Sequence, residues 1–135
     1  MKRLCFVLAL ALTTAALSTA ASPLSTPSIN LVHGLPGTLN IGDVDTVIVQ
    51  VNSTQEYLQV QAMPSFAYPG KGVVAVQGGD HAGRGTSAVL KVTFEAKTST
   101  AKMVDGVAPV HVVVGVRYPG GSVAVEDYVF YVAVP

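Results

Sequence analysis

The side chains best suited to chemistry are concentrated in one glycine-rich segment, Gly78–Ser87 (GGDHAGRGTS). Within it, Asp80, His81 and Arg84 supply a carboxylate, an imidazole and a guanidinium, although only 12% of the whole chain is charged. A phosphate-binding loop needs a Lys-Ser/Thr pair followed by a helix, and this segment has neither. The pattern therefore indicates either a flexible loop between strands, whose glycines permit positive φ angles, or a loop that binds a ligand through these three side chains.

A second candidate for ligand binding is the aromatic segment Ala62–Gly70, which holds Phe66 and Tyr68 between two prolines. Aromatic loops at the end of a β-sandwich are common contact points for carbohydrate or protein. The alternative is that both rings fold back over the end of the core, because the chain has only four Phe, five Tyr and no Trp to fill it.

Three histidines, His33, His81 and His111, are the candidate metal ligands, with Met63 and Met103 as thioether donors. Imidazole with thioether suits copper, and imidazole alone suits zinc. However, no two of the histidines have the short spacing of a ligand pair, and His111 alternates onto the solvent face of an expected strand. Solvated histidines are the competing interpretation.

No group of residues predicts catalysis. Ser87, His81 and Asp80 lie within eight residues of one loop, where they cannot provide a nucleophile, a base and a separate orienting acid. Asp43 and Asp45 offer too few oxygen ligands for calcium and instead indicate a turn. We therefore expect a protein that is not an enzyme and that needs no cofactor.

The elements that must position these residues are β-strands, because apolar side chains recur with a period of two. Ala88–Ala96 (AVLKVTFEA) is the clearest case, with Leu90, Val92 and Phe94 opposing Lys91, Thr93 and Glu95. One face of such a strand is core and the other is solvent, as in an antiparallel sheet. The other expected strands are Thr46–Asn52, Tyr57–Ala62, Val107–Tyr118 and Tyr128–Val134, with weaker candidates at Ile29–His33, Thr38–Ile41 and Val73–Gln77.

The strands are separated by turn residues, among them Gly78-Gly79-Asp80 and Pro119-Gly120-Gly121. Tyr128–Val134 (YVFYVAV) is apolar throughout, which predicts a strand that is covered on both sides or lies centrally in its sheet. The spacing predicts an all-β fold, an antiparallel sandwich of seven or eight strands. A small closed barrel is the alternative, because periodicity does not separate the two.

The first residues predict export. Lys2 and Arg3 precede the apolar run Leu4–Leu12, and small residues follow up to an expected cleavage after Ala20 or Ala21. The apolar run is shorter than the roughly 20 residues that a spanning helix needs, so no membrane span is expected after cleavage. The predicted organisation is a signal peptide at 1–21 and one domain at 22–135. Cleavage removes the chain's single cysteine, Cys5.

The charge of the expected domain argues against nucleic acid as a partner. Residues 22–135 carry six Lys/Arg and eight Asp/Glu, a formal net charge of −2, and the basic residues do not cluster. Proteins that bind nucleic acid present a basic patch to the phosphates.

Two motifs carry a resemblance to a known family. Thr38–Asp43 (TLNIGD) leads into Val47–Asn52 (VIVQVN), and Val112–Gly121 (VVVGVRYPGG) precedes the last apolar strand. In both respects the chain resembles the immunoglobulin-like modules of bacterial surface and secreted proteins, of the adhesion-module type. The resemblance implies an immunoglobulin-like β-sandwich, but without the Cys…Trp…Cys arrangement of antibody domains.

Together these features predict a non-enzymatic secreted, periplasmic or cell-envelope module that acts through surface contacts in adhesion, envelope structure or assembly. A protein or glycan on the cell surface would be its partner. One alternative is a periplasmic copper- or zinc-binding protein. The other is a small carbohydrate- or ligand-binding sandwich.

Overall fold

The computed structural model describes residues 26–65 and 72–135, so the predicted signal peptide, Phe66 and Tyr68 lie outside the described residues. The regular structure of the described chain consists of β-strands and one short 3₁₀ turn, η1 (Val104–Gly106). The strands are β1 (Ser28–His33), β2 (Val44–Tyr57), β3 (Gln59–Pro64), β4 (Val73–Ala75), β5 (Asp80–Ala82), β6 (Gly85–Ala96), β7 (Ala108–Arg117) and β8 (Val123–Val132).

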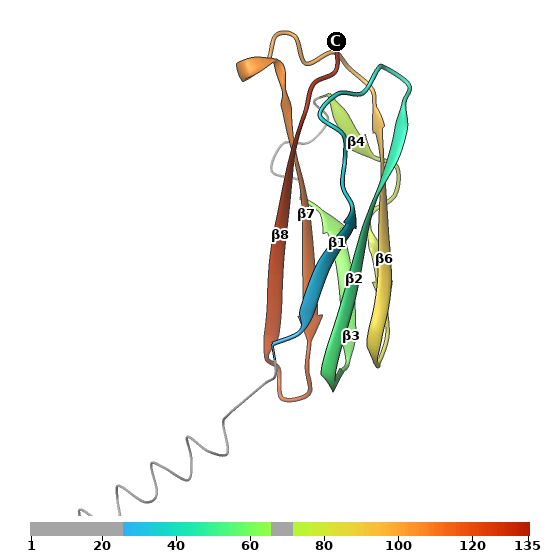
Figure 1. Cartoon of the computed structure of the whole chain (residues 1–135), viewed down its shortest axis with the longest axis vertical. Coiled ribbons are helices and arrows are strands. Elements are labelled where there is room, and N and C mark those ends of the chain that lie inside the picture. The colour runs from blue at the N-terminus through green and yellow to red at the C-terminus, as the bar shows by residue number, and fades with distance from the viewer. Residues whose placement is uncertain (1–25, 66–71) are drawn as a thin grey trace, which may run out of the picture.

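The strands form two separate four-stranded sheets that pack face to face (Figure 1). The first sheet has the order β1-β2-β6-β4 and the second has the order β5-β3-β7-β8, with antiparallel pairing between neighbouring strands in both. The fold is therefore an immunoglobulin-like β-sandwich, as the sequence predicts.

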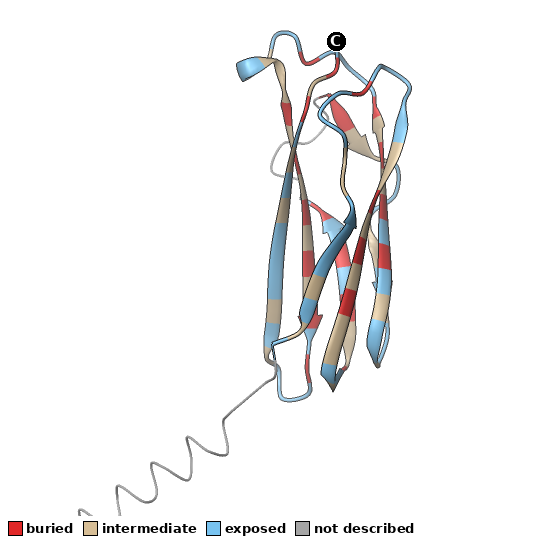
Figure 2. Ribbon diagram, in the orientation of Figure 1, coloured by how far each residue is buried: buried red, intermediate tan, exposed pale blue. Residues whose placement is uncertain are grey.

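The core lies between the sheets and follows the period of two. In the first sheet, Val47, Val49 and Val51 of β2 face inward, and in the second sheet Val112 and Val114 of β7 do the same. All are 0–1% exposed, and the red bands of Figure 2 mark such positions along β2 and β7. Burying each valine stabilises the fold by about 1.5–3 kcal/mol.

One end of the core is filled by two tyrosines. Tyr57 and Tyr118 are the largest fully buried side chains among the described residues. The hydroxyl of Tyr118 hydrogen-bonds to the hydroxyl of Ser53 at 2.7 Å. Burial raises the pKa of Tyr57 above its usual 10.0, and the neighbouring Tyr118 adds to the effect.

The opposite end is held by Thr100, which is the one fully buried polar residue of the described chain. Its Oγ1 donates to the carbonyl of Gly106 at 2.6 Å and accepts from the N–H of Val134 at 2.8 Å. Its backbone N–H donates to the carbonyl of Val134 at 2.8 Å. Thr100 thus ties the loop before β7 to the segment after β8.

The chain changes sheet on both sides of the sandwich. After β1 pairs with β2, Thr38 forms a parallel bridge with Ala133 beyond β8. On the other side, β4 pairs with β6 and β5 then pairs with β3. The edge strands β1, β4 and β5 have six, three and three residues, whereas β8, the other edge of the second sheet, has ten.

The two motifs behind the family resemblance form turns. In the first, the carboxylate of Asp43 accepts from the N–H of Asn40 at 2.9 Å, and Gly42 adopts a φ of 95°. In the second, Gly120 and Gly121 adopt φ angles of 89° and 91° in the turn that joins β7 to β8. Glycine alone takes such angles without steric cost.

Two expectations from the sequence are wrong. Tyr128–Val134 neither lies centrally nor is covered on both sides: β8 is an edge strand, and Figure 2 shows it mostly exposed or half-buried. The Gly78–Ser87 segment is not wholly a loop, because Asp80–Ala82 pairs with β3 as β5. Strand order, which the residues of β8 do not encode, decides the first case, and the second depends on pairing with β3.

No helix within the described ranges is long and apolar enough to cross a membrane.

Candidate functional site

The ligand-binding residues expected in the glycine-rich segment take separate roles. The two carboxylate oxygens of Asp80 accept from the N–H groups of His81 and Lys91, each at 2.9 Å. Because β5 belongs to the second sheet and Lys91 to the first, this carboxylate joins the two sheets at their edge. Arg84 pairs with Glu56 at 3.4 Å, and both side chains are more than half exposed, so the pair contributes about 0–1 kcal/mol.

His81 is exposed on β5, opposite Gln61 of β3. The segment therefore does not gather its acid, imidazole and guanidinium around one ligand. The other two residues proposed for ligand binding, Phe66 and Tyr68, are outside the described residues.

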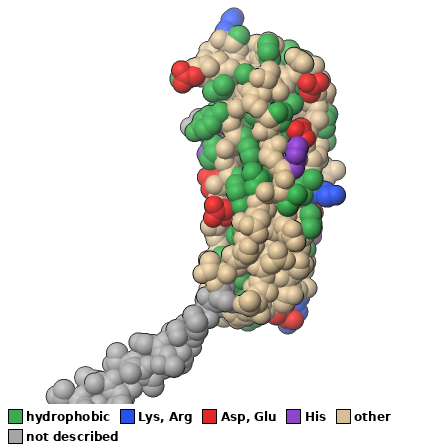
Figure 3. Space-filling view, in the orientation of Figure 1, with side chains coloured by type: hydrophobic (Ala, Val, Ile, Leu, Met, Phe, Trp, Pro, Cys, Tyr) green, Lys and Arg blue, Asp and Glu red, His purple; other side chains and the backbone are tan. Residues whose placement is uncertain are grey.

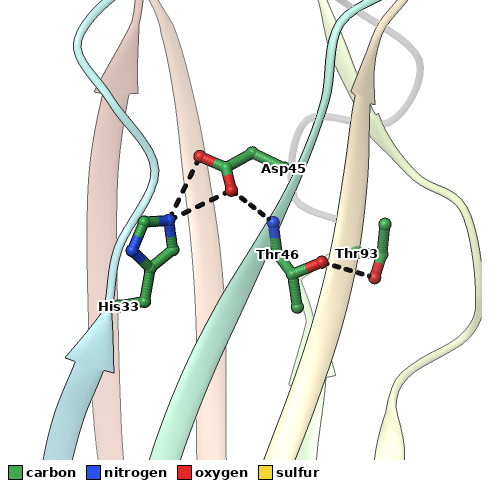
Figure 4. A network of polar contacts seen from close by, with 4 residues as sticks. All are labelled: His33, Asp45, Thr46 and Thr93. Carbon is green, nitrogen blue, oxygen red and sulfur yellow. Dashed lines mark hydrogen bonds and ion pairs between the residues drawn. The ribbon is translucent and has the colours of Figure 1, made fainter.

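The three candidate metal ligands lie on three strands, β1, β5 and β7. Nε2 of His33 contacts the carboxylate of Asp45 at 3.0 Å in the network of Figure 4. Nδ1 of His111 contacts the carboxylate of Asp127 at 3.2 Å on the other sheet. In the part of the chain that the structure describes, no three His, Cys, Asp or Glu side chains are grouped to hold a metal ion.

The outer face of the first sheet carries polar side chains that bind each other, and Val89 of β6 is also exposed there. The hydroxyls of Thr46 and Thr93 are 2.9 Å apart across β2 and β6 (Figure 4). Further along the same two strands, Ser87 donates to the side-chain carbonyl of Asn52 at 2.9 Å. Such cross-strand pairs satisfy the polar groups within the sheet itself.

The outer face of the second sheet is different, because β8 presents an apolar row to solvent. The register of β7 and β8 places Tyr128 beside the buried Val112, so the residues that alternate with Tyr128 face outward. We call four of them the apolar row, and they are 56%, 62%, 39% and 65% exposed: Val123, Val125, Val129 and Tyr131. Figure 3 views the side on which β8 and β1 lie, and exposed hydrophobic side chains gather over its upper part.

A hollow of about 300 Å³ lies at the C-terminal end of the apolar row, and we call it the tyrosine hollow. The turn of η1 shapes it, because Asp105 and Gly106 adopt φ angles of 54° and 68° and Val104 is left 84% exposed. The lining side chains are apolar except for the carboxylate of Asp105 and the hydroxyl of Tyr131. The lining residues are Met103, Val104, Asp105, Val107, Pro109 and Tyr131.

A second hollow, of about 170 Å³, lies at the N-terminal end of the row, and we call it the arginine hollow. Its floor is open because Gly115 has no side chain in the middle of β7. The guanidinium of Arg117 and two amides supply polar groups. The lining residues are Gln59, Gln61, Gly115, Arg117 and Val123.

Sequence reasoning did not predict this surface. Gly115, inside an otherwise apolar strand, was the available signal, because a strand glycine often marks a place where another molecule approaches the backbone. Val129 and Tyr131 belong to the segment Tyr128–Val134, which the sequence predicts as a covered or central strand, and Val123 and Val125 precede the expected strand.

No family model matches the sequence. No curated protein matches it either.

Two solved structures show the same fold at low identity. The ASH/PapD-like domain 7 of human CEP192 has a TM-score of 0.51 and 9% identity, covering 85% of this chain and 89% of that one. The structure of native alpha-2-macroglobulin from Escherichia coli, from domain MG7 to the C-terminus, has a TM-score of 0.50 and 10% identity. It matches 83% of this chain, which spans only 17% of that structure. These similarities show the immunoglobulin-like fold and nothing further.

Proposed function

We propose that this protein is a non-enzymatic secreted or cell-envelope module that works through surface contacts, and that the outer face of the second sheet is its contact surface. The observation that carries the proposal is the apolar row, because four large apolar side chains of one strand lie exposed on the same face. A single exposed apolar residue is ordinary, but two pairs on one face, one on either side of Asp127, form an apolar surface of the kind that is typical of an interaction site.

The two hollows also favour the outer face of the second sheet as the contact surface. Each lies at one end of the apolar row, so a partner lying along β8 has a place for a side chain at both ends. Tyr131 also supports this face as the contact surface, because large amphipathic rings of this kind often dominate the binding energy at protein interfaces. A protein or glycan of the cell surface is the partner that fits this function.

Neither alternative has a comparable observation in its favour. The metal-binding hypothesis needs His33, His81 and His111 to converge, whereas two of them contact aspartates on different sheets. The ligand-binding hypothesis is centred on Phe66, Tyr68 and the glycine-rich segment. Phe66 and Tyr68 lie outside the described residues, and in the glycine-rich segment the carboxylate oxygens of Asp80 accept from backbone N–H groups.

A matched pair of substitutions tests the contact surface. Val125 of β8 and Val89 of β6 are 62% and 54% exposed, on the outer faces of opposite sheets. We expect the purified protein to bind a cell-surface fraction or a glycan array, Val125→Ser to weaken that binding at least fivefold, and Val89→Ser to leave it unchanged. Equal effects of the two substitutions, or no binding by the unaltered protein, would contradict the proposal.

Export is tested separately. The protein recovered from an exporting host should begin at Ala21 or Ser22 when its N-terminus is sequenced, because the small residues there suit cleavage. Retention of Leu4–Leu12 on the recovered protein would contradict a cleaved signal peptide.

A further inference from the structure

The backbone of β8 has an unpaired edge beside the apolar row. Ala133 donates its N–H to the carbonyl of Gly37 and accepts from the N–H of Leu39, both at 2.9 Å, so its peptide groups point away from β7. Successive residues of a strand direct these groups to opposite sides, and the register of β7 and β8 runs without a shift. The residues that point the same way are therefore Val123, Val125, Asp127, Val129 and Tyr131.

Within residues 26–65 and 72–135, no strand or loop hydrogen-bonds to the backbone of these five residues. Although β1 runs nearby, it pairs with β2, and the Tyr128 hydroxyl reaches the carbonyl of Ile29 by a side-chain contact only. The free edge from Val123 to Tyr131 is about 30 Å long at the usual rise per residue. The other edge strands are shorter: β4 and β5 have three residues each, and β1 has six with an irregularity.

From this geometry we infer that the free edge of β8 receives an extended segment of another protein as an additional strand. This inference rests on the proposed function and specifies how the contact is made. The peptide groups give the segment its hydrogen bonds, while its alternate side chains lie beside the apolar row.

The charges on β8 define the occupant. Glu126 and Asp127 are the only charged residues of the strand, and Asp127 is the central residue of the free edge. Two copies of this chain pairing antiparallel over the full edge would place one Asp127 opposite the other, which is unfavourable. A segment with apolar residues on its outer face and a lysine or arginine at the centre places a positive charge there instead, and is the occupant we propose.

The test uses a blocked nine-residue peptide, VTVTKTVTV, which places its lysine beside Asp127 in the fully paired antiparallel register. We expect amide hydrogen exchange at Val125, Asp127 and Val129, measured by NMR, to slow at least tenfold when the peptide is present. Two control peptides should give no protection. One has glutamate in place of the lysine, and the other is N-methylated at its third and seventh residues, which removes the N–H groups opposite Val129 and Val125 and places methyl groups against the edge.

Two variants separate strand addition from side-chain docking. Val125→Pro removes an N–H that has no partner in the described fold, and should abolish peptide protection while circular dichroism remains that of β-structure. Val125→Thr keeps the N–H and the shape of the side chain, and should retain protection within threefold.

Three results would overturn the inference: binding that perturbs outer-face side chains without protecting these amides, protection that rises with protein concentration alone, and no protection by any peptide. The first would leave the proposed contact surface standing and remove only the strand addition. The second would identify a second copy of the chain as the occupant.

Discussion

The outer faces of the two sheets have the same backbone architecture but differ in how much large apolar surface one strand exposes. On the first sheet, Thr46 binds Thr93 and Ser87 binds Asn52, so polar groups are satisfied by neighbouring strands. On the second sheet, Val125 and Tyr131 are 62% and 65% exposed, and hollows lie at both ends of their strand. The fold itself requires neither arrangement, because the core is built from the inner faces alone.

The difference shows which of the two outer faces offers more to a partner. The inner faces of both sheets are rich in valine, and both serve to bury apolar side chains in the core. They account for the stability of the fold and give no information about partners. An outer face that pairs its own polar groups gains little from a partner. An outer face with unburied apolar side chains gains about 25 cal/mol for each Å² that a partner covers.

The largest expected effect tests the equivalence of the two inner faces. Val92→Asp in the first sheet and Val114→Asp in the second should each abolish folding, because the side chains are 2% and 0% exposed and the new carboxylate has no partner. Lys91→Asp, on the outer side of the same strand as Val92, should cost less than about 1 kcal/mol. Urea unfolding followed by circular dichroism measures all three, and equal damage from Lys91→Asp and Val92→Asp would show that the inside and outside of β6 are wrongly assigned.

The next effect concerns the loop that forms the tyrosine hollow. Thr100→Val removes the bonds to Gly106 and Val134 and leaves their polar groups buried, which should destabilise the fold by about 1–3 kcal/mol. Thr100→Ser keeps the hydroxyl and is the matched control. Chemical unfolding compares the two, and an equal loss in both variants would show that the methyl group, and not the hydrogen bonds, holds this end.

A smaller effect tests whether the outer face of the first sheet is satisfied by its own pairs. A double-mutant cycle on Thr46→Val and Thr93→Val should give a coupling of about 0.2–1 kcal/mol in the free energy of unfolding. A coupling of zero would mean that solvent satisfies these hydroxyls equally well, and the contrast between the two faces would weaken.

The smallest effect is a pH dependence on β8. Burial raises the pKa of Tyr128 above 10.0, and the nearby Glu126 raises it further. Tyr128 therefore keeps its proton to higher pH in the folded form than in the unfolded form. The contribution of the protonated Tyr128 to the free energy of unfolding is complete below pH 10.0 and is lost as the pH rises through the folded pKa. Tyr128→Phe should flatten the fall in thermal stability above pH 10.0, apart from a constant offset for the lost bond to Ile29. An unchanged pH profile would count against burial of this hydroxyl.

Much of the fold could be predicted from the sequence, because alternation of side chains reports directly on which face of a strand is buried. Ala88–Ala96 and Thr46–Asn52 fall within observed strands, β6 and β2. The position of β8 could not be predicted, since an apolar strand at the edge and one at the centre have the same local pattern. The strand β5 could not be predicted because it has only three residues, which is too short for an alternation of side chains to show. The glycines and charged residues around it are typical of a turn.

The candidate site was less predictable than the fold. Asp80, His81 and Arg84 were singled out for their chemistry, but the structure commits Asp80 to backbone groups and Arg84 to Glu56. The contact surface proposed instead depends on which strands are neighbours and which edge is left open. Both are properties of the assembled sheets, and Gly115 was the one residue that hinted at them.

Footprinting of the protein while it is bound to its cell-surface partner tests the central claim most directly. Hydrogen exchange measured by mass spectrometry, with and without the bound fraction, compares peptides that cover Val123–Tyr131 with peptides that cover Ser87–Glu95. The account predicts strong protection of Val123–Tyr131 on the second sheet and none of Ser87–Glu95 on the first. Protection of Ser87–Glu95 with β8 unchanged would contradict it.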